Sequence, residues 1–434
     1  MAKLNAQARP IYTHEGAKAR HITAELQLRR SVLACLLWER EFYEDGRAVA
    51  QRIVDTIPMV TPGKVAALAI EARTQMKLRH VPLLLVAAMA KLPTHKHLVA
   101  ETLRAVIQRP DELTEFLAIY WRTGKCPLSA QVKKGLAGAF TKFSEYQLAK
   151  YNRDAAIKLR DVLFLCHAKP KDAEQALVWK SLVEGTLATP DTWEVALSAG
   201  EDKKQTWERL LAEGKLGALA LLRNLRNMQS VDVSETAIKD GLLRMRTDRV
   251  LPFRFIAAAR YAPRLEPELE AVMFKCVAEV QKLPGKTVLL VDVSGSMEHP
   301  ISAKSEMSRF DAACGLAVLA REICESVEVL TFSNQVVQVP PRRGFALRDA
   351  VLGSQMHRGT YLGQAVELVN QNFDYDRLIV FTDEQSHDRV PAPSGKGYVV
   401  NVASCKNGVG YGAWRHIDGF SESVLDYIRE SESF

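Results

Sequence analysis

Residues 287–297 read Thr287-Val-Leu-Leu-Val-Asp292-Val-Ser294-Gly-Ser296-Met297, an apolar run that ends in one acid and two hydroxyls. The run is typical of a buried parallel strand, and the polar residues are typical of a tight loop after it. Hard divalent cations such as Mg²⁺ bind oxygen ligands of this kind together with water. This stretch therefore predicts an α/β domain with a metal site at one edge of its sheet.

Strand and helix patterns alternate after Gln281-Lys-Leu-Pro-Gly285, which we interpret as a linker. Alternation of this kind is typical of a mostly parallel sheet with helices on both faces. We expect this second domain to span residues 286–434. Its expected strands are 288–293, 327–332, 336–339, 377–382 and 398–402, and its expected helices are 309–326, 362–372 and 421–429.

Two further polar loops occur where such a sheet would gather its ligands, at the carboxyl ends of strands. One contains Thr360 and precedes a helix, and the other contains Asp383 and follows a strand. The alternative is that these side chains only cap local turns. No histidine or cysteine accompanies them as a base or nucleophile, so we expect no enzymatic activity. The predicted ligands of Mg²⁺ or another divalent cation are Asp292, Ser294, Ser296, Thr360 and Asp383.

This arrangement resembles a von Willebrand factor A domain with a metal-ion-dependent adhesion site. The resemblance covers about residues 286–434, and all five predicted ligands match the motif. It implies a Rossmann-like α/β fold. It also implies an ion that leaves one coordination position for an acidic group of a partner.

The preceding part of the chain, from about residue 20 to 281, is helical in pattern. Val99, Leu103, Val106 and Ile107 fall on one helical stripe, and short breaks such as Thr61-Pro-Gly63 recur. Helix pairs with short connections are typical of an α-solenoid or a bundle. We therefore assign residues 1–281 to a helical-repeat domain.

Charge is distributed unevenly between these two parts. Residues 1–282 contain 44 Lys and Arg against 32 Asp and Glu, a net charge of +12, whereas the remainder carries −5. A basic part suggests a polyanionic partner, although solvated helices often carry a modest excess of this kind. The cations gather between residues 133 and 160, where only two acids oppose Lys133, Lys134, Lys142, Lys150, Arg153, Lys158 and Arg160.

Several segments of the helical part identify a family resemblance. They are Phe42-Tyr-Glu-Asp-Gly46, Asp161-Val-Leu-Phe-Leu-Cys-His167-Ala-Lys-Pro170, the stretch 218–228 and Leu251-Pro-Phe-Arg-Phe255. Placed before a von Willebrand A domain, they resemble the TROVE module of Ro ribonucleoproteins, nearest to the bacterial members. Asp418-Gly-Phe420 resembles the end of Ro proteins, so the likeness covers nearly the whole chain.

The resemblance implies a ring of HEAT-like helical repeats whose outer surface binds small noncoding Y RNAs. It implies that the hole of the ring takes the single-stranded 3′ end of misfolded RNA. It also implies an exoribonuclease partner such as polynucleotide phosphorylase. On this basis we predict that the seven cations between residues 133 and 160 contact RNA. The chain departs from the family at Leu159, where members place a histidine used in RNA contact. Phe143, Tyr146 and Tyr151 lie among the cations, and we interpret them as core residues rather than base-stacking ones.

Composition excludes several other classes. The chain is 47% hydrophobic and 25% charged, and its seven cysteines form no CxxC pair. We expect a cytoplasmic protein with no membrane association, disulfide or zinc site. Two alternatives remain open. One is a metal-dependent protein-interaction scaffold that does not bind RNA, and the other is an accessory subunit that recruits a metal-chelatase-type ATPase.

Overall fold

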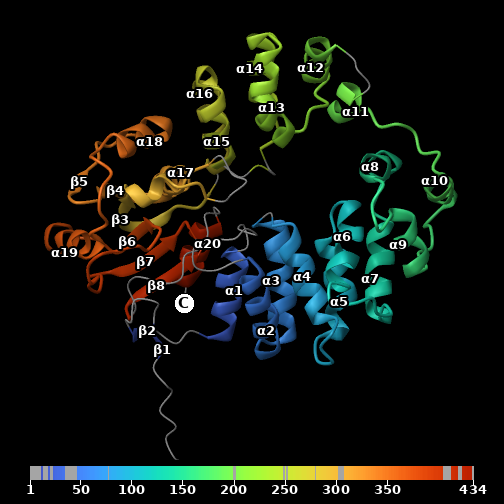
Figure 1. Cartoon of the computed structure of the whole chain (residues 1–434), viewed down its shortest axis with the longest axis horizontal. Coiled ribbons are helices and arrows are strands. Elements are labelled where there is room, and N and C mark those ends of the chain that lie inside the picture. Colours follow the sequence, from blue (N-terminus) through green and yellow to red (C-terminus); the bar gives the residue numbers. More distant parts are fainter. Residues whose placement is uncertain are drawn as a thin grey trace, which may run out of the picture. The chain divides into compact units, whose positions relative to one another are not determined.

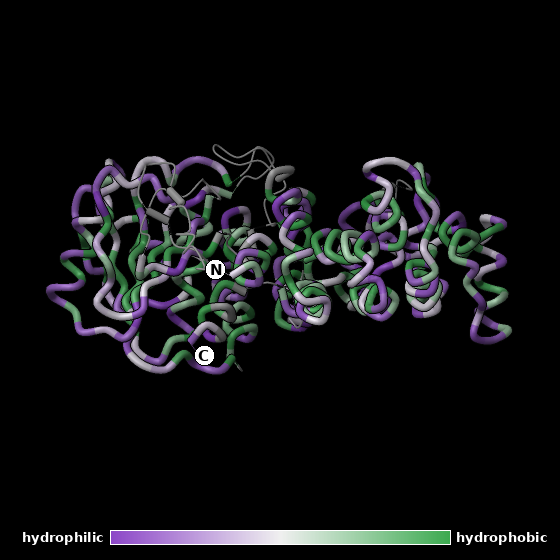
Figure 2. The backbone as a smooth tube through the Cα atoms, turned by 90° about the horizontal axis from the view of Figure 1, so that it is seen from below, coloured by the Kyte–Doolittle hydropathy of each residue, from purple (hydrophilic) through white to green (hydrophobic). Residues whose placement is uncertain are grey.

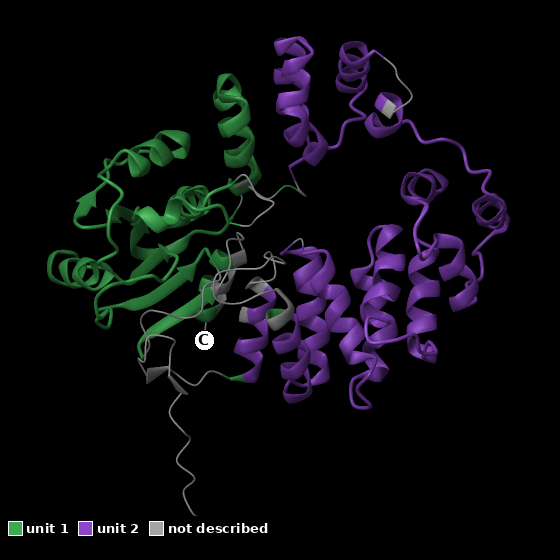
Figure 3. Cartoon of the chain, in the orientation of Figure 1, with its two compact units in different colours: residues 1–23, 33–49, 250–434 green, residues 24–32, 50–249 purple. Residues whose placement is uncertain are grey.

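The structure of the 434-residue chain is a computed structural model. It divides into two compact units (Figure 3). The helical unit contains residues 24–32 and 50–249, and the sheet unit contains residues 1–23, 33–49 and 250–434. The structure describes residues 11–12, 18–19, 23–34, 46–76, 78–198, 202–247, 250, 253–278, 280–301, 307–403, 412–418 and 423–432.

The helical unit consists of α-helices joined by turns and by several longer loops, such as the one between α10 and α11 (Figure 1). Among the helices that the structure describes, none combines the length and the apolar character that a membrane span requires. In chain order the helices are α1 (Ala24–Ala34), α2 (Gly46–Thr56), α3 (Pro62–Thr74), α4 (His80–Met89), α5 (Val99–Val106), α6 (Asp111–Tyr120), α7 (Ala130–Phe140), α8 (Glu145–Tyr151), α9 (Leu159–Cys166), α10 (Ala173–Glu184), α11 (Trp193–Ser198), α12 (Lys203–Ala212), α13 (Ala218–Ser230) and α14 (Glu235–Arg244).

Helices α3 to α9 pack as stacked pairs. Helix α3 contacts α5, α5 contacts α7 and α7 contacts α9, while α4 contacts α6. The predicted apolar stripe is buried, with Val99, Leu103 and Ile107 each 0% exposed. Within the helices, apolar residues alternate with hydrophilic residues from one side of the helix to the other (Figure 2). The stacking arises because each helix buries one apolar stripe against its neighbours.

Two contacts fix the spacing of this stack. A β-carbon at Gly135 would lie 2.9 Å from Cβ of Leu103, so α5 and α7 approach at backbone distance. Arg73 of α3 pairs with the fully buried Glu112 of α6 at 2.5 Å. The second carboxylate oxygen of Glu112 accepts the amide hydrogen of Gln108 at 2.7 Å, which organises the turn before α6. Burial raises the pKa of the Glu112 carboxyl, against the opposing charge of Arg73.

The sheet unit contains a six-stranded sheet with the strand order β5-β4-β3-β6-β7-β8. All neighbouring strands run parallel except β5, which is antiparallel to β4. The two-residue strands β1 (Ile11–Tyr12) and β2 (Lys18–Ala19) form a separate antiparallel pair. The elements of the sheet and the helices beside it are α15 (Phe253–Tyr261), α16 (Glu266–Val277), β3 (Leu283–Asp292), α17 (Arg309–Ile323), β4 (Cys324–Phe332), β5 (Val336–Gln338), α18 (Gly344–Leu352), α19 (Leu362–Asn372), β6 (Arg377–Thr382), β7 (Lys396–Asn401), β8 (Trp414–Asp418) and α20 (Ser423–Glu432).

Helices cover both faces of this sheet. Val288 and Leu290 of β3 join one core with Val366 and other residues of α19. Helix α17 packs on β3, β4 and β6, and Tyr398 of β7 donates its hydroxyl hydrogen to Glu432 of α20. Successive side chains along a strand point to opposite faces of the sheet. Because helices cover both faces, the side chains on both sides of the central strands are buried, and the sequence of these strands is continuously apolar.

Helices α15 and α16 pack within the sheet unit, where α15 contacts α17 and α16 contacts α18. Glu270 of α16 accepts the amide hydrogen of Phe345 at 2.7 Å, and Glu266 pairs with Arg348 of α18 at 2.8 Å. The compact units therefore divide near residue 250, whereas the sequence pattern placed the change of domain at residues 281–286.

Two local predictions are wrong. The helix expected over 309–326 ends at Ile323, and Cys324 begins β4, because Cys324 pairs with Leu283 of β3. The same pairing makes Leu283 part of a strand rather than of a linker. Helix α18 and strand β8 were not predicted at all.

Candidate functional site

The predicted metal ligands gather at the carboxyl ends of β3 and β6, which are neighbouring parallel strands. Asp292 is the last residue of β3, and Thr382 is the last residue of β6. Thr382 Oγ1 donates a hydrogen bond of 2.6 Å to Asp292 Oδ2, and the Ser294 amide donates one of 2.9 Å to Oδ1. The hydroxyl oxygens of Ser294 and Ser296 lie 3.2 Å apart. Both oxygens of Asp292 are therefore held by uncharged donors.

The loop that carries Thr360 is joined to the loop after β3. The amide of Gly295 donates a hydrogen bond of 2.9 Å to the carbonyl oxygen of Arg358. The Ser333 hydroxyl oxygen, after β4, accepts the amide hydrogen of Arg358 at 2.9 Å. Thr360 is buried, and its carbonyl oxygen accepts the amide hydrogen of His387 at 2.9 Å. Hydrogen bonds thus connect all three loops that hold the predicted ligands.

Asp383 contacts a positive charge that the sequence analysis missed. Arg309, the first residue of α17, donates from Nη1 to Asp383 Oδ2 at 2.7 Å. The two side chains are 7% and 0% exposed. The same nitrogen lies 3.4 Å from the carbonyl oxygen of Ser296. Arg309 therefore compensates one of the two buried carboxylates and also contacts the loop of the other.

Asp292 makes no ion pair with any residue that the structure describes. Its burial, together with the negative charge of Asp383, raises the pKa of Asp292 to about 7. Burying a charged carboxylate without an opposite charge costs free energy and raises its pKa. A bound cation lowers the pKa of a carboxyl group beside it. The surroundings of Asp292 therefore favour a cation beside it.

The five predicted ligands fit a hard cation. All offer oxygen atoms, and four are almost completely buried, whereas Ser296 is half-buried. Within the described ranges there is no group of three or more histidine, cysteine and acidic side chains placed to bind a metal. An ion here would take most of its ligands from hydroxyls and water, which suits Mg²⁺ and not zinc. The metal site stays a prediction.

A second buried pair fixes the loop after β6. Glu384 follows Asp383 with a positive φ of 61° and lies 2.9 Å from Nδ1 of His416 in β8. The amide of Glu384 donates to Thr382 Oγ1 at 3.0 Å. Neither Glu384 nor His416 was predicted from the sequence as a site residue. The only sign of this pair in the sequence was that Glu384 is an acid next to Asp383. Its partner His416 lies in β8, a strand that was not predicted.

The predicted RNA-contacting cations lie on α7, α8 and α9 and the turns between them. Five of them form no ion pair with the acidic residues that the structure describes, and none of the five is buried. We call these five the basic surface: Lys133, Lys134, Lys150, Arg153 and Arg160.

The other two predicted cations have partners within the protein. Lys142 donates from its ammonium to the carbonyl oxygens of Arg104 and Ile107, which end α5. Burial lowers the pKa of Lys142, and the charge of Arg104 lowers it further. Lys158 pairs with Asp154 at 2.6 Å on the surface. Lys142 thus has a structural role that the sequence analysis missed.

The aromatic residues among these cations differ in burial. Phe143 is 4% exposed, as expected of a core residue, and Tyr151 is half-buried with the guanidinium of Arg109 over its ring at 4.7 Å. Tyr146, however, is 48% exposed on α8, so the core interpretation is wrong for it. Leu159 is buried at the start of α9.

Stacked helices with a basic surface, together with a doubly wound sheet that carries polar loops at its strand ends, define a two-part scaffold. Residues 184–300 match the family model of the TROVE domain. This segment runs from the end of α10 to the loop after β3. The resemblance to TROVE-domain Ro proteins is therefore confirmed.

Known proteins resemble this chain in fold and in sequence. The crystal structure of the Deinococcus radiodurans Ro (Rsr) protein aligns with a TM-score of 0.64 and 20% identity, covering 92% of this chain and 96% of that chain. This likeness shows the fold. Telomerase protein component 1 is 22% identical over 338 residues in Rattus norvegicus and 23% identical in Mus musculus. The match covers 57% of this chain but only 13% of each relative.

Parts of the sequence motifs that carried the resemblance lie outside the described residues. These parts are 42–45, 251–252 and 419–420.

Proposed function

We propose that this chain is the RNA-binding scaffold of a Ro-type ribonucleoprotein. The observation that carries the proposal is the basic surface on α7, α8 and α9, within a chain that carries a TROVE match. Cations on a rigid helical stack bind the phosphate backbone and set the position of an RNA while reading little of its sequence. The partner that suits such a surface best is a small, folded noncoding RNA of the Y type.

The second part of the proposal concerns RNA quality control. We propose that the helices form HEAT-like repeats that close into a ring, whose hole takes the single-stranded 3′ end of misfolded RNA. An exoribonuclease such as polynucleotide phosphorylase then degrades this RNA. The proposal assigns no chemical step to the scaffold itself. Its support is the family resemblance, together with the stacked helix pairs α3 to α9.

For the sheet unit we propose a von Willebrand A domain with a divalent cation. Asp292, Ser294 and Thr360 would hold the ion, with Ser296 and Asp383 completing the set. When bound, the ion supplies a positive charge to which an acidic group of a partner can coordinate. The pairing of β3 with β6 and the raised pKa of Asp292 support this assignment.

A second candidate function is a metal-dependent protein-interaction scaffold without direct RNA binding. The specific observation in its favour is the pair of buried carboxylates, Asp292 and Asp383, at the strand ends. RNA binding by the purified protein separates the two candidates.

The test uses two matched pairs of adjacent lysines. Lys133 and Lys134 belong to the basic surface, and Lys203 and Lys204 are exposed at the start of α12. Binding of a fluorescent stem–loop RNA with a single-stranded 3′ tail is followed by anisotropy at low salt. Replacing Lys133 and Lys134 by Glu should weaken binding at least about ten-fold, because two phosphate contacts become repulsive.

The same change at Lys203 and Lys204 should have little effect, and both double variants should melt near the wild-type temperature. Equal losses from both pairs would show that the basic surface is not the RNA site. Failure of the wild-type protein to bind this RNA at low salt would favour the protein-interaction scaffold.

A further inference from the structure

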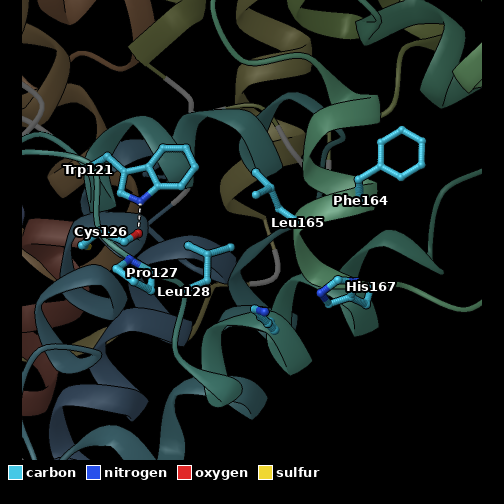
Figure 4. Close-up of a pocket in the computed structure, with 8 residues that line it drawn as sticks. Trp121, Cys126, Pro127, Leu128, Phe164, Leu165 and His167 are labelled. Atoms are coloured by element: carbon cyan, nitrogen blue, oxygen red, sulfur yellow. Dashed lines mark hydrogen bonds between the residues drawn. The ribbon is translucent and has the colours of Figure 1, made fainter.

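A groove of about 370 Å³ lies beside the basic surface, between the α6–α7 loop and α9 (Figure 4). A second hollow of about 510 Å³ shares Trp121, Cys126, Pro127 and Leu165 with it. The groove is lined by Trp121, Cys126, Pro127, Leu128, Lys133, Phe164, Leu165 and His167. None of these residues except Lys133 was assigned to a site from the sequence.

The groove presents apolar side chains to solvent where a helix would ordinarily be polar. Phe164 is 59% exposed and Leu165 is 38% exposed on α9, with Leu165 directed toward Trp121 and the Phe164 ring directed away from it (Figure 4). Exposed aromatic and aliphatic side chains beside one another are typical of a binding site, because covering them removes apolar area from water. The other face of α9 supplies the core residues Val162 and Cys166.

The walls of the groove are held in place. Trp121 Nε1 donates a hydrogen bond of 2.8 Å to the carbonyl oxygen of Cys126, which fixes the indole against its own loop (Figure 4). His167 ends α9 in the left-handed region, with φ 53°, and its amide bonds back to Phe164. The side chain of His167 also lines the groove.

Most of the charged residues around the groove are basic, with Asp161 lining the adjoining hollow. Residues 116–144 contain no acid but carry Arg122, Lys125, Lys133, Lys134 and Lys142. Residues 162–171 likewise contain no acid but carry Lys169 and Lys171. Lys125 Nζ lies 5.5 Å from the centroid of the Trp121 ring, so a cation stands at the edge of the apolar surface. The occupant must therefore combine an apolar, flat part with negative charge.

We propose that this groove accepts an unpaired nucleobase of a bound RNA, with the phosphates on either side of that base on the neighbouring lysines. Aromatic side chains beside cations bind single strands in this way, through stacking that tolerates any base. A base inside a duplex presents only its edges and cannot enter, so the groove selects loops, bulges and single-stranded ends. The inference rests on the proposed RNA-binding function and names a specific subsite within it.

The test compares two short RNA oligomers of equal length and charge, an oligouridylate and its abasic counterpart. Wild-type protein should bind the oligouridylate about ten-fold more tightly, because stacking on the exposed Phe164 ring requires a base. Phe164→Ala should remove most of this preference and leave binding of the abasic oligomer unchanged. Phe164→Trp should retain the preference.

Tyr146→Ala is the matched control, because Tyr146 is 48% exposed on α8 but does not line the groove. It should keep the wild-type preference. Equal binding of both oligomers by the wild-type protein, or an unchanged preference in Phe164→Ala, would overturn the base subsite and leave RNA binding intact. Failure of the wild-type protein to bind either oligomer would instead contradict the proposed function itself.

Discussion

The guanidinium of Arg309 donates a 2.7 Å hydrogen bond to the carboxylate of Asp383, and both side chains are almost completely buried. The pair joins the first turn of α17 to the loop after β6, beside the predicted metal ligands. Removing one member of a buried ion pair leaves the other charge without compensation in a poorly polarisable environment. The two residues therefore contribute to stability as a pair.

Arg309→Met should lower the free energy of unfolding by about 3 kcal/mol or more, because Asp383 then lies buried beside Asp292 without a cation. Urea unfolding in the presence of a chelator measures this loss. Lys286→Met is the control, since Lys286 and Asp374 form an exposed pair in the same unit and the change should alter stability little. Similar stabilities for both variants would show that the Arg309 pair is not an important contact.

Added Mg²⁺ should raise the melting temperature of the wild-type protein, because a ligand that binds only the folded state stabilises it. At a concentration about 100 times its dissociation constant, the gain is about 2.7 kcal/mol. Asp292→Asn should abolish the gain, since it removes the buried carboxylate at the end of β3. Asp376→Asn, at the other end of the neighbouring strand, should keep it. A Mg²⁺ response that survives in Asp292→Asn would exclude this site.

Lys142→Gln should lower stability by about 1 kcal/mol, because the ammonium group satisfies two carbonyl oxygens at the end of α5. RNA affinity should change little, because this charge is already directed at the backbone. Lys134→Gln should give the reverse result, a loss of RNA affinity at unchanged stability. Thermal melting and anisotropy on the same samples distinguish the two lysines. If Lys142→Gln lost RNA affinity while keeping full stability, Lys142 would belong to the RNA site.

Hydrogen bonds from Arg209 and Lys215 lower the pKa of the Asp191 carboxyl to about 2. Because this pKa lies below the value of about 3.9 in an unfolded chain, the contribution to stability is present above pH 4. It is lost as the pH falls from about 4 toward 2. Titration of the carboxyl carbon by NMR should give the low value in the wild-type protein and a higher one in Arg209→Gln. An unchanged titration in that variant would contradict the assigned cause.

The helical stripes were predictable because burial imposes a strict period on the sequence. Leu103 and Ile107 lie where their stripe placed them, each 0% exposed. The ends of the elements were less predictable, because pairing across the sheet decides them. Cys324 leaves its predicted helix to pair with Leu283, which is 41 positions earlier in the chain. Strand β8 was missed because its short run gains its stability from β7 rather than from its own pattern.

The candidate ligands could be predicted because neighbouring parallel strands end at the same edge of a sheet. That rule places Asp292 and Thr382 side by side, as observed. It says nothing of Arg309, which reaches the site from a helix 17 positions after Asp292. The groove could not be predicted from the sequence either. The helical period of apolar residues identifies the buried side of α9, but it does not show that Phe164 on the other side stays exposed.

Lys142 also changes how strongly salt should weaken RNA binding. Each single-strand phosphate that a cation neutralises contributes about −0.7 to the slope of log affinity against log salt concentration. Seven cations would give a slope of about −5, but Lys142 is directed at backbone carbonyls and Lys158 is matched by Asp154. The five remaining cations set an upper limit of about −3.5. The RNA affinity of the helical surface should therefore fall less steeply with salt concentration than that of a fully available basic stripe.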